Sequence, residues 1–463
     1  MITRTDLEER VREWGLREEI VEKDYVLGWI LWGIGSDERL SITWVFKGGT
    51  CLKKCYIETY RFSEDLDFTV LPGGPILPTE IEPILNDILR RVGDESGINF
   101  AGRPPLLKGH PSGLYTEGRI YYQGPRNAPK VTRIKLDLSS SEEVVRPTVL
   151  RMITHAYPDE LPEPATIRCY SFDEIFAEKI RAMGERGRPR DLYDIINLFR
   201  RSDLQAEPQI IHSVLVRKCQ SKSIPVPTFT AIESSNIRTE LEAEWANMLS
   251  HQLPALPPFE SFWEELPKLF GWLEGTHEVE KLEPIPLGVG EEEPAKWTPP
   301  PTVWTWNVGA PLETIRFAAS NHLCVKLGYD GTTRIIEPYS LRQTSDGNLL
   351  LHAIRIDSRE HRSYRVDRIQ SIEVTTQPFR PVYKVEFSHS GAIQAPPTIR
   401  TTRQSQSRSN TVYRRSGLVY IIECPYCKKR FRRKNHNTNL NPHKDKFGYP
   451  CPGRYGYMVE YKY

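Results

Sequence analysis

The sequence KGGT at residues 47–50, followed by RFSEDLD at residues 61–67, decides what kind of core this chain builds. Two adjacent glycines let a backbone turn approach phosphate groups, and Thr50 can cap the helix that follows, so that its N–H groups face an anion. In a strand, Asp65 and Asp67 point to the same face, where two carboxylates can hold divalent cations. Either motif alone is more often an ordinary turn or an exposed acidic strand end. Together, in this order, they predict a metal clamp beside a site for a nucleotide triphosphate.

The segments around these motifs fit one core. Residues 44–46 are an apolar run that leads into the glycines, residues 51–60 have a helical pattern, and residues 115–123 and 130–138 predict a pair of strands. The second of these strands alternates charged and apolar residues, and its only acid is Asp137. Asp137 either meets the first two carboxylates or faces water at a strand end, and the spacing alone fits both interpretations.

Two helices are predicted within residues 171–200. Ser171 is the N-cap of the first, and Glu174 completes a capping box. Lys179 in the first helix and Asp191 in the second are placed so that they can face each other across the turn. The alternative is a surface helical hairpin held by ion pairs.

Length and composition limit the class of protein. A chain of 463 residues is long enough for about three domains, and 39% hydrophobic residues can bury sizeable cores. The longest apolar run, residues 26–34, is far shorter than the ~20 residues of a membrane-spanning helix. The charged N-terminus is unlike a signal peptide, so we expect a cytoplasmic protein with no membrane partner. Five cysteines lie scattered among apolar neighbours, and we expect them to be reduced core residues: Cys51, Cys55, Cys169, Cys219 and Cys324.

The chain is predicted to be an α+β protein of several parts. We expect a core with N-terminal helices at 1–200, a helical region at 201–280, a Pro- and Glu-rich linker at 281–311, a small β-barrel at 312–388, a second linker at 389–415, and a basic module at 416–463.

The C-terminal end is strongly basic. Residues 401–463 contain 14 Lys and Arg against 3 Asp and Glu, although the net charge of the whole chain is only +2. Such a segment is either a solubilising tail or a contact for nucleic acid, and the interleaved aromatic residues favour nucleic acid. The expected contacts are Lys428, Lys429, Arg430, Arg432, Arg433 and Lys434.

The same module carries metal-ligand residue types. Cys424 and Cys427 have the spacing of half a tetrahedral zinc site, and His443 and Cys451 can complete it. His436 is a competing ligand, and a redox Cys-x-x-Cys pair is the rival interpretation. Because a module this small needs a metal or a cross-link to stabilise its fold, the Zn²⁺ would be structural.

Residues 20–200 resemble the AbiEii/AbiGii toxin family of nucleotidyltransferases. The resemblance rests on four stretches in order, which are VEKDY at 21–25, KGGT at 47–50, RFSEDLD at 61–67, and AEKIRA at 177–182 continuing through RDLYD at 190–194. It implies a polymerase-beta-like nucleotidyltransferase core with an NTP as donor and Mg²⁺ or Mn²⁺ as cofactor. It also implies a cognate antitoxin as partner, and several members act on tRNA ends. The typical toxin stops soon after its helical region, whereas this chain continues.

The family's functional residues carry over to matching positions. The resemblance implies that Asp65 and Asp67 coordinate the metal, with Asp137 as a third acid supported only by its strand pattern. Lys179 would neutralise phosphate charge, and Asp191 would orient Lys179 or the nucleotide. The residues expected to bind the nucleotide are Lys47, Gly48, Gly49, Thr50, Arg61 and Arg190.

Residues 312–375 resemble a WYL-type domain, an SH3-like barrel associated with bacterial regulators. The matching pieces are RIIEPYSL at 334–341 and YRVDRI at 364–369, while the Trp-Tyr-Leu triplet itself is absent. One interpretation is a ligand pocket built on one aromatic and three basic side chains, and the other is that the arginines pair with local acids. These residues are Tyr339, Arg355, Arg365 and Arg368.

These features predict a metal-dependent nucleotidyltransferase that transfers NMP from an NTP to an RNA acceptor, with tRNA favoured. The setting would be toxin–antitoxin or phage defence. The alternative is a nucleic-acid-responsive regulator that uses its nucleotidyltransferase core only to bind nucleotide. A protein hydroxyl as acceptor is a weaker interpretation, because the basic C-terminus argues against it. The sequence leaves the identity of the NTP, the antitoxin and the oligomeric state open.

Overall fold

The chain folds into two compact units, Met1–Pro397 and Thr398–Tyr463, in the computed structural model. The predicted linkers at 281–311 and 389–415 fall largely outside the residues that the structure describes. These residues are 1–57, 60–129, 131–204, 206–278, 281–286, 312–343, 349–387, 419–425, 427–433, 438, 440, 442–443, 451–453 and 456–462.

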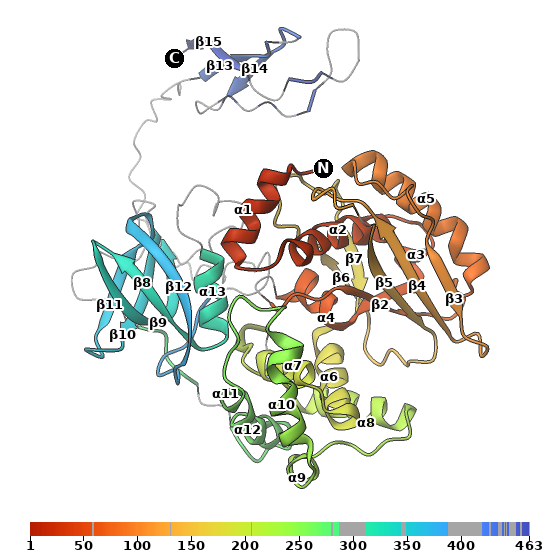
Figure 1. Cartoon of the computed structure of the whole chain (residues 1–463), viewed down its shortest axis with the longest axis vertical. Helices are drawn as coiled ribbons and strands as arrows, with labels where there is room; N and C mark the ends of the chain where they lie inside the picture. The colour runs from red at the N-terminus through yellow and green to blue at the C-terminus, as the bar shows by residue number, and fades with distance from the viewer. Residues whose placement is uncertain are drawn as a thin grey trace, which may run out of the picture. The chain divides into compact units, whose positions relative to one another are not determined.

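A seven-stranded mixed sheet with the order β3-β4-β5-β2-β1-β7-β6 forms the core of the first unit (Figure 1). Strand β2 runs parallel to β5 and antiparallel to β1, and β1 runs parallel to β7. Because β2 lies between β1 and β5, residues far apart in sequence come into register at the centre of the sheet. The strands are β1 (Trp44–Lys47), β2 (Asp65–Val70), β3 (Leu106–Gly109), β4 (Tyr115–Tyr122), β5 (Thr132–Ser139), β6 (Val149–Met152) and β7 (Thr166–Cys169).

Four helices accompany this sheet: α1 (Arg4–Trp14), α2 (Glu18–Gly35), α3 (Leu40–Thr43) and α5 (Pro78–Ser96). Helix α1 has sharp ends, because Thr3 and Asp6 form a capping box and Gly15 closes the C-terminus in the left-handed region. Helix α2 is buried along most of its length and is packed closely against α5. A Cβ at Gly33 would lie 2.6 Å from a Val92 methyl group, so the small residue permits this contact.

The segment after β1 differs from the single helix predicted at residues 51–60. It forms a short α4 (Gly48–Cys51) that continues as a π-helix (Leu52–Tyr56). A π-helix has one more residue per hydrogen-bonded ring than an α-helix and frequently occurs at functional sites. No local pattern in the sequence distinguishes the two helix types.

A helical region follows the sheet. The Ser171 cap is confirmed, since its hydroxyl accepts the Glu174 N–H, but the predicted capping box is wrong. The Glu174 carboxylate instead accepts the backbone N–H groups of Val145 and Arg146, each at 2.8 Å. The helices are α6 (Phe172–Arg186), α7 (Pro189–Phe199), the 3₁₀ turn η2 (Ser202–Leu204), α8 (Pro208–Ser221), α9 (Phe229–Glu233), α10 (Ile237–Leu249), α11 (Glu260–Trp263) and α12 (Leu266–Leu273).

The predicted region of short strands is a five-stranded antiparallel sheet with the order β11-β10-β9-β8-β12. Leu351 belongs to the main hydrophobic core, and Tyr339 is buried in a smaller cluster with Cys324, Ile354 and Phe379. The elements are α13 (Leu312–Ser320), β8 (Leu323–Tyr329), β9 (Thr332–Gln343), β10 (Leu349–Arg355), β11 (His361–Arg365), the 3₁₀ turn η4 (Val366–Arg368) and β12 (Ile369–Pro378).

The second unit contains a three-stranded antiparallel sheet with the order β14-β13-β15. The core formed by the described residues of this unit contains Ile422, Leu440 and two cysteines. The strands are β13 (Val419–Glu423), β14 (Arg430–Arg433) and β15 (Tyr457–Lys462). Among the described residues of both units, no helix is long and apolar enough to cross a bilayer.

Candidate nucleotidyl-transfer site

Three acidic residues meet at the centre of the first unit's sheet. Asp65 and Asp67 share one face of β2, and Asp67 lies in register with Asp137 on the parallel strand β5. The structure therefore brings together the three predicted carboxylates, including Asp137.

Two of the carboxylates, Asp65 and Asp67, have a raised proton affinity. Partial burial, together with the nearby Asp137 and Asp65 charges, raises the pKa of Asp67 to about 6, and burial also raises the pKa of Asp65. Asp137 Oδ1 is buried without a hydrogen-bond partner among the described residues. Mutual repulsion and an unsatisfied oxygen are what a divalent cation would relieve, so the three side chains fit a Mg²⁺ or Mn²⁺ site.

The glycine turn lies directly against this acidic cluster. Gly48 has a φ of 80°, and a Cβ built there would collide with the Asp67 carboxylate. A Cβ at Gly49 would lie 2.8 Å from a guanidinium nitrogen of Arg61. Both glycines are therefore required by close approach, and Gly48 also by its left-handed backbone.

Thr50 does not cap the helix as predicted. Lys47 occupies the N-cap position of α4 without a capping hydrogen bond, and the Thr50 hydroxyl donates to the Asp65 carbonyl oxygen at 2.5 Å. The threonine thus fixes the glycine turn to the strand that carries the carboxylates.

Lys47 is held by two acids that the sequence analysis did not assign to the site. Its ammonium pairs with Glu142 and lies 3.6 Å from a Glu178 carboxylate oxygen. Although burial opposes a charge, Glu178 and Glu142 hold the pKa of Lys47 above its usual value. Burial likewise opposes ionisation of Glu178, yet Lys47 and Lys218 lower its pKa to about 2. Glu178 stands within the AEKIRA stretch, but only the fold places it beside Lys47.

The predicted pairing of Lys179 with Asp191 is wrong. Lys179 Nζ lies 2.7 Å from Asp194 Oδ2, and Asp191 binds Arg186 instead, with both contacts at 2.9 Å. The two acids are three residues apart on α7, and the packing of α6 against α7 selects Asp194.

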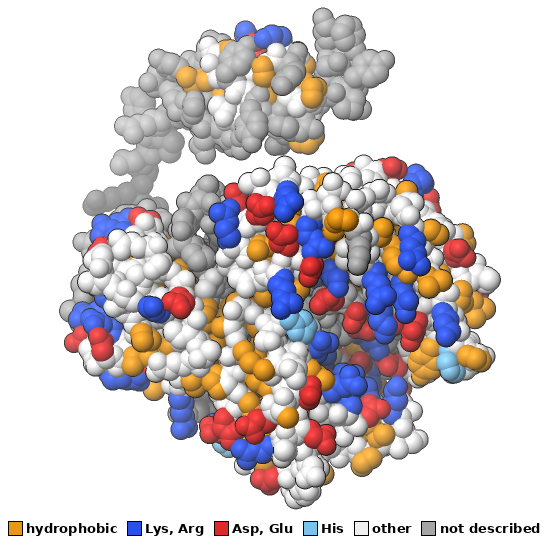
Figure 2. Space-filling view, in the orientation of Figure 1, with side chains coloured by type: hydrophobic (Ala, Val, Ile, Leu, Met, Phe, Trp, Pro, Cys, Tyr) orange, Lys and Arg blue, Asp and Glu red, His pale blue; other side chains and the backbone are white. Residues whose placement is uncertain are grey.

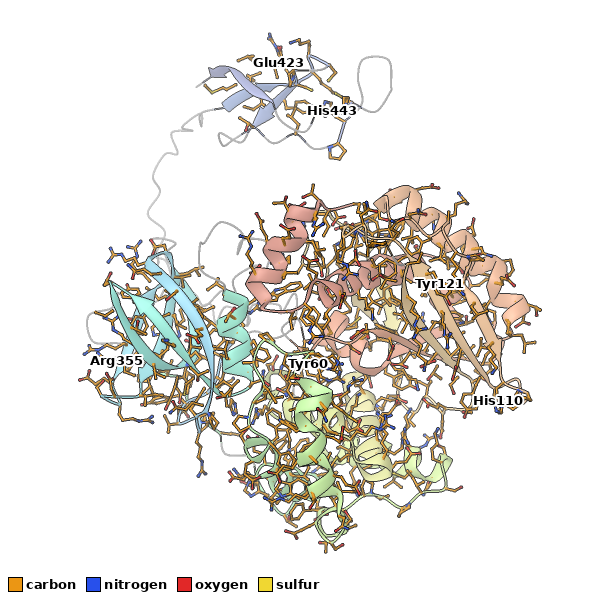
Figure 3. The ribbon with its side chains drawn as sticks, in the orientation of Figure 1. Tyr60, His110, Tyr121, Arg355, Glu423 and His443 are labelled. Atoms are coloured by element: carbon orange, nitrogen blue, oxygen red, sulfur yellow. The ribbon has the colours of Figure 1, made fainter. Side chains whose placement is uncertain are left out.

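Asp194 is a fully buried centre of hydrogen bonds. Tyr60, labelled in Figure 3, donates to it at 2.6 Å, and Arg61 binds it through two nitrogens at 2.6 and 2.7 Å. Burial alone would raise the pKa of Asp194, but Arg61 and Lys179 hold it below its usual value. Arg61 was expected to contact phosphate. Its buried guanidinium is committed to Asp194 and to Gln252, so it acts as a structural anchor here.

Arg190 remains a candidate for phosphate binding. Its Nε is buried and has no hydrogen-bond partner among the described residues. Burial and the nearby Arg61 charge lower the pKa of Arg190, whereas the charges of Asp65 and Glu64 act to raise it. A cation in this position is available to an anionic ligand.

A groove of about 520 Å³ extends from Asp65 across β3, β4 and β5. Figure 2 shows Lys and Arg side chains gathered on the face over these strands. The sequence analysis did not assign this surface, although alternation along residues 130–138 placed Arg133 and Lys135 on one face. The groove is lined by Lys23, Glu64, Asp65, Leu106, Lys108, Glu117, Gly118, Arg119, Arg133 and Lys135.

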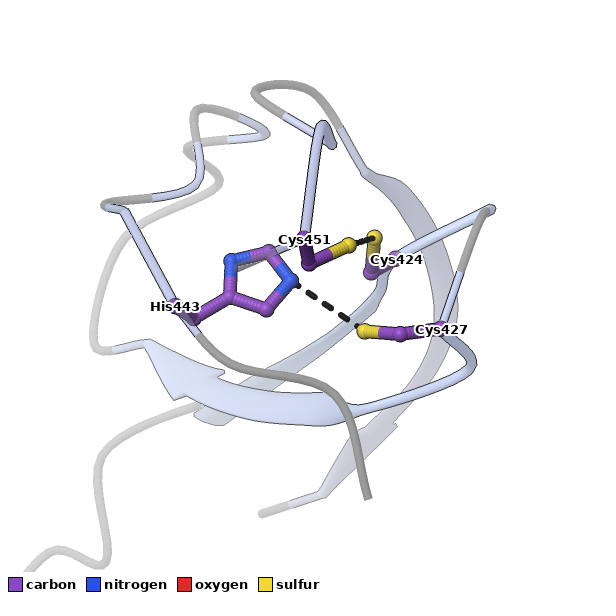
Figure 4. A group of neighbouring side chains, drawn as sticks. All are labelled: Cys424, Cys427, His443 and Cys451. Atoms are coloured by element: carbon purple, nitrogen blue, oxygen red, sulfur yellow. Dashed lines mark hydrogen bonds between the residues drawn. The ribbon is translucent and has the colours of Figure 1, made fainter. Parts of the chain in front are cut away.

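The predicted cysteine and histidine ligands meet in the second unit (Figure 4). The sulfur atoms of Cys424 and Cys451 are 3.7 Å apart, and Cys427 Sγ lies 3.2 Å from His443 Nε2. Tetrahedral zinc with Zn–S bonds of about 2.3 Å separates its sulfur ligands by a similar distance, so the four residues fit Zn²⁺. The competing ligand His436 lies outside the described residues.

The basic surface of this unit is described in part. Lys428, Lys429 and Arg430 are exposed, and Arg430 pairs with Glu423 at 2.9 Å. Arg432 and Arg433 lie on β14, but their side chains fall outside the described ones, and Lys434 lies outside the described residues.

The pocket suggested for the WYL-like region does not form from the expected residues. Tyr339 is buried and donates to Glu337 at 3.1 Å. Arg355 pairs with Asp357, and Arg365 pairs with Asp367 at 2.7 Å. For Arg355 and Arg365, these contacts match the alternative in which the arginines pair with local acids.

Two family models match parts of this chain. The family model described as nucleotidyl transferase AbiEii toxin, type IV toxin–antitoxin system, matches residues 29–266, which is just over half of the chain. The WYL domain model matches residues 311–374. Among solved structures, a nucleotidyltransferase toxin of Mycobacterium tuberculosis H37Rv, MenT4, matches with a TM-score of 0.44 and 18% identity. That alignment covers 59% of this chain and 90% of the toxin. A comparison with curated proteins gives no match.

Proposed function

Because the chain belongs to the AbiEii nucleotidyltransferase toxin family, we propose that it transfers NMP from an NTP to RNA and acts as the toxin of a toxin–antitoxin or phage-defence pair. The observation that carries the proposal is the contact between the glycine turn at Gly48 and the Asp67 carboxylate, with Asp137 in register beside it. This contact supports the assignment of a phosphate-binding turn next to an acidic metal site. The favoured acceptor is tRNA.

The three carboxylates are the proposed metal ligands. A divalent cation held by Asp65, Asp67 and Asp137 would polarise the transferred phosphoryl group and favour deprotonation of the acceptor hydroxyl. Asp67 must be ionised to serve as a ligand, and a bound cation would favour that state against the repulsion of its two neighbours.

The surrounding residues would bind and orient the triphosphate. The backbone N–H groups of the turn at Gly48 and Gly49 would bind phosphate oxygens, and the Arg190 guanidinium supplies a positive charge near Asp65. Lys179 would face the transferred phosphate from its position on Asp194. Lys47 would contact phosphate only after giving up part of its pairing with Glu142 and Glu178.

The groove over β3 to β5 supports a polyanionic acceptor. It opens beside Asp65, and its exposed basic residues are spaced along three adjacent strands. Phosphodiester backbones bind such surfaces with a strong dependence on salt. The basic zinc module supplies a second surface of the same charge, which favours RNA over a protein hydroxyl.

The test is transfer of label from each α-³²P-NTP into total bacterial RNA with Mg²⁺. We expect label in tRNA-sized RNA with the wild-type chain and with Asp87→Asn, a change on the exposed face of α5, and none with Asp67→Ala. Label that is equal in Asp67→Ala and wild type would contradict the assignment of the site.

The groove is tested with Arg119→Glu and with the matched change Arg90→Glu on α5. We expect the Arg119 variant to bind RNA more weakly and to lose about one unit of salt slope, because it removes one phosphate contact. NTP binding should be unchanged in both variants. An Arg119 variant with the salt slope of the Arg90 variant would place the acceptor elsewhere.

A ligand-responsive regulator is the second candidate. A pocket of about 620 Å³ in the WYL region is lined by Glu337 and Arg359, which form an ion pair, and by Cys324 and Phe379. NTP binding without label transfer to RNA or protein would favour this function.

A further inference from the structure

Two cysteines that closely follow the glycine turn in sequence meet a third cysteine from strand β7. Cys51 is the last residue of α4, Cys55 lies in the π-helix, and Cys169 ends β7. Their sulfur atoms all lie within 4.8 Å of one another, and none of the side chains is more than 6% exposed. Cys169 donates weakly to the Ile167 carbonyl at 3.5 Å.

The fold assembles this cluster from the elements that shape the nucleotide site. Cys169 is paired in register with Phe46, the residue before Lys47, and Cys51 directly follows Thr50. The change from α- to π-helix between Cys51 and Cys55 sets the relative position of their two sulfur atoms. All three thiols are therefore fixed to the turn that contains Gly48.

Positive charge lies close to the cluster. Arg151 donates to the Cys55 carbonyl at 3.1 Å and stacks on the Tyr56 ring, with its guanidinium carbon 4.5 Å from the ring centroid. Lys54 is buried in an ion pair with Asp24 at 2.7 Å. Three thiolates around a divalent cation have a net charge of −1, which the Arg151 guanidinium can offset within the buried site.

We propose that Cys51, Cys55 and Cys169 form a trigonal thiolate site for a thiophilic d¹⁰ cation, separate from the C-terminal zinc cluster. Binding releases one proton from each thiol, forms three metal–sulfur bonds and requires no oxidant. Thiolate sulfur selects soft cations over Mg²⁺. Among the described residues, no His, Asp, Glu or further Cys joins this group, so its geometry differs from the four-ligand set at Cys424. An occupied site would tie β7 to the glycine turn.

The test is titration of the full, reduced chain with Cd²⁺ and, in a separate arm, with Cu⁺, following the ultraviolet thiolate-to-metal band and the bound-metal stoichiometry. We expect the wild-type chain to bind at both clusters, and Cys51→Ala and Cys169→Ala each to lose one equivalent. Cys424→Ser should keep the equivalent at Cys51. Cys219→Ala removes a buried cysteine on α8 outside either cluster and should keep both equivalents.

A thermal melt distinguishes the loss of a metal site from misfolding of a variant. In the Cys424→Ser background, Cd²⁺ should raise the Tm, because a ligand that binds only the folded chain stabilises it. The same addition should leave the Tm of the Cys424→Ser, Cys55→Ser double variant unchanged. Equal Cd²⁺ stoichiometry in Cys51→Ala and Cys219→Ala, or no Tm shift with either cation in the Cys424→Ser background, would overturn the proposal.

Discussion

At the scale of single residues, the site depends on contacts so close that a different side chain would displace its neighbours. Gly48 lies against the Asp67 carboxylate, Asp67 faces Asp137, and Thr50 is bonded to the Asp65 backbone. The contacts of Gly48 and Thr50 join the glycine turn to β2, and the register of Asp67 with Asp137 joins β2 to β5. Small displacements here should therefore affect nucleotide and metal binding together.

Gly48→Ala tests this dependence, with Gly73→Ala as a matched control. Both glycines have φ near 80°, but a Cβ at Gly73 meets no atom within 4 Å, whereas one at Gly48 collides with Asp67. We expect both variants to lose about 1 kcal/mol of stability from backbone strain. Only Gly48→Ala should lose activity, by about 100-fold, because the carboxylate is displaced. Equal activity of the two variants, measured by label transfer, would show that the close approach is dispensable.

The raised pKa of Asp67 predicts a pH-dependent stability in the absence of metal. Burial and its acidic neighbours raise this pKa from 3.8 to about 6. Between these two pH values, the Asp67 carboxyl therefore keeps its proton in the folded chain and loses it in the unfolded chain. The resulting stabilisation is complete below pH 4 and is lost as the pH rises through 6. With EDTA, the Tm of the wild type should fall across this range relative to Asp67→Asn. Added Mg²⁺ should raise the wild-type Tm near pH 7, and parallel Tm curves for the two proteins would contradict the shift.

At the scale of elements, helix α7 fixes the loop before β2 to the helical region. Its Asp194 accepts hydrogen bonds from Tyr60 and Arg61 and pairs with Lys179 of α6. The loop before β2 and the helices α6 and α7 are thus joined through one buried carboxylate.

Asp194→Asn should destabilise the chain by about 3 kcal/mol, because it leaves two buried cations without a counter-charge. Glu185→Gln breaks an ion pair with Arg181 whose acidic partner is 42% exposed, and it should cost about 1 kcal/mol or less. Urea unfolding of both variants measures the difference. A loss in Asp194→Asn no larger than in Glu185→Gln would mean that the buried network contributes little to stability.

The sequence predicts this site where local rules apply and fails where packing decides. Alternation and turn chemistry identify the glycines, Asp65, Asp67 and the strand that carries Asp137. The choice of Asp194 over Asp191 depends on how two helices pack, which a local pattern does not contain. The π-helix and the meeting of Cys169 with Cys51 likewise arise from long-range pairing.

At the scale of the whole molecule, the candidate sites are divided between two compact units. The first contains the acidic site and the groove, and the second contains the basic zinc-type module. Among the described residues of the second unit, two of the cysteines belong to the core, so a metal held by them would stabilise the fold of this unit. Zinc in the second unit should therefore control RNA contact and leave nucleotide chemistry in the first unit intact.

Cys424→Ser in the full chain tests this separation. We expect the variant to lose its zinc, because a buried thiolate ligand is removed, and to bind RNA with a smaller salt slope as the basic module unfolds. NTP binding should match that of Cys219→Ser, which changes a buried cysteine outside the cluster. Metal analysis, RNA titration and NTP titration of the two variants measure the three effects. Full zinc retention in Cys424→Ser would exclude this residue as a ligand. Zinc loss with unchanged RNA binding would assign RNA recognition to the groove beside Asp65, since the basic module would then be dispensable for the acceptor.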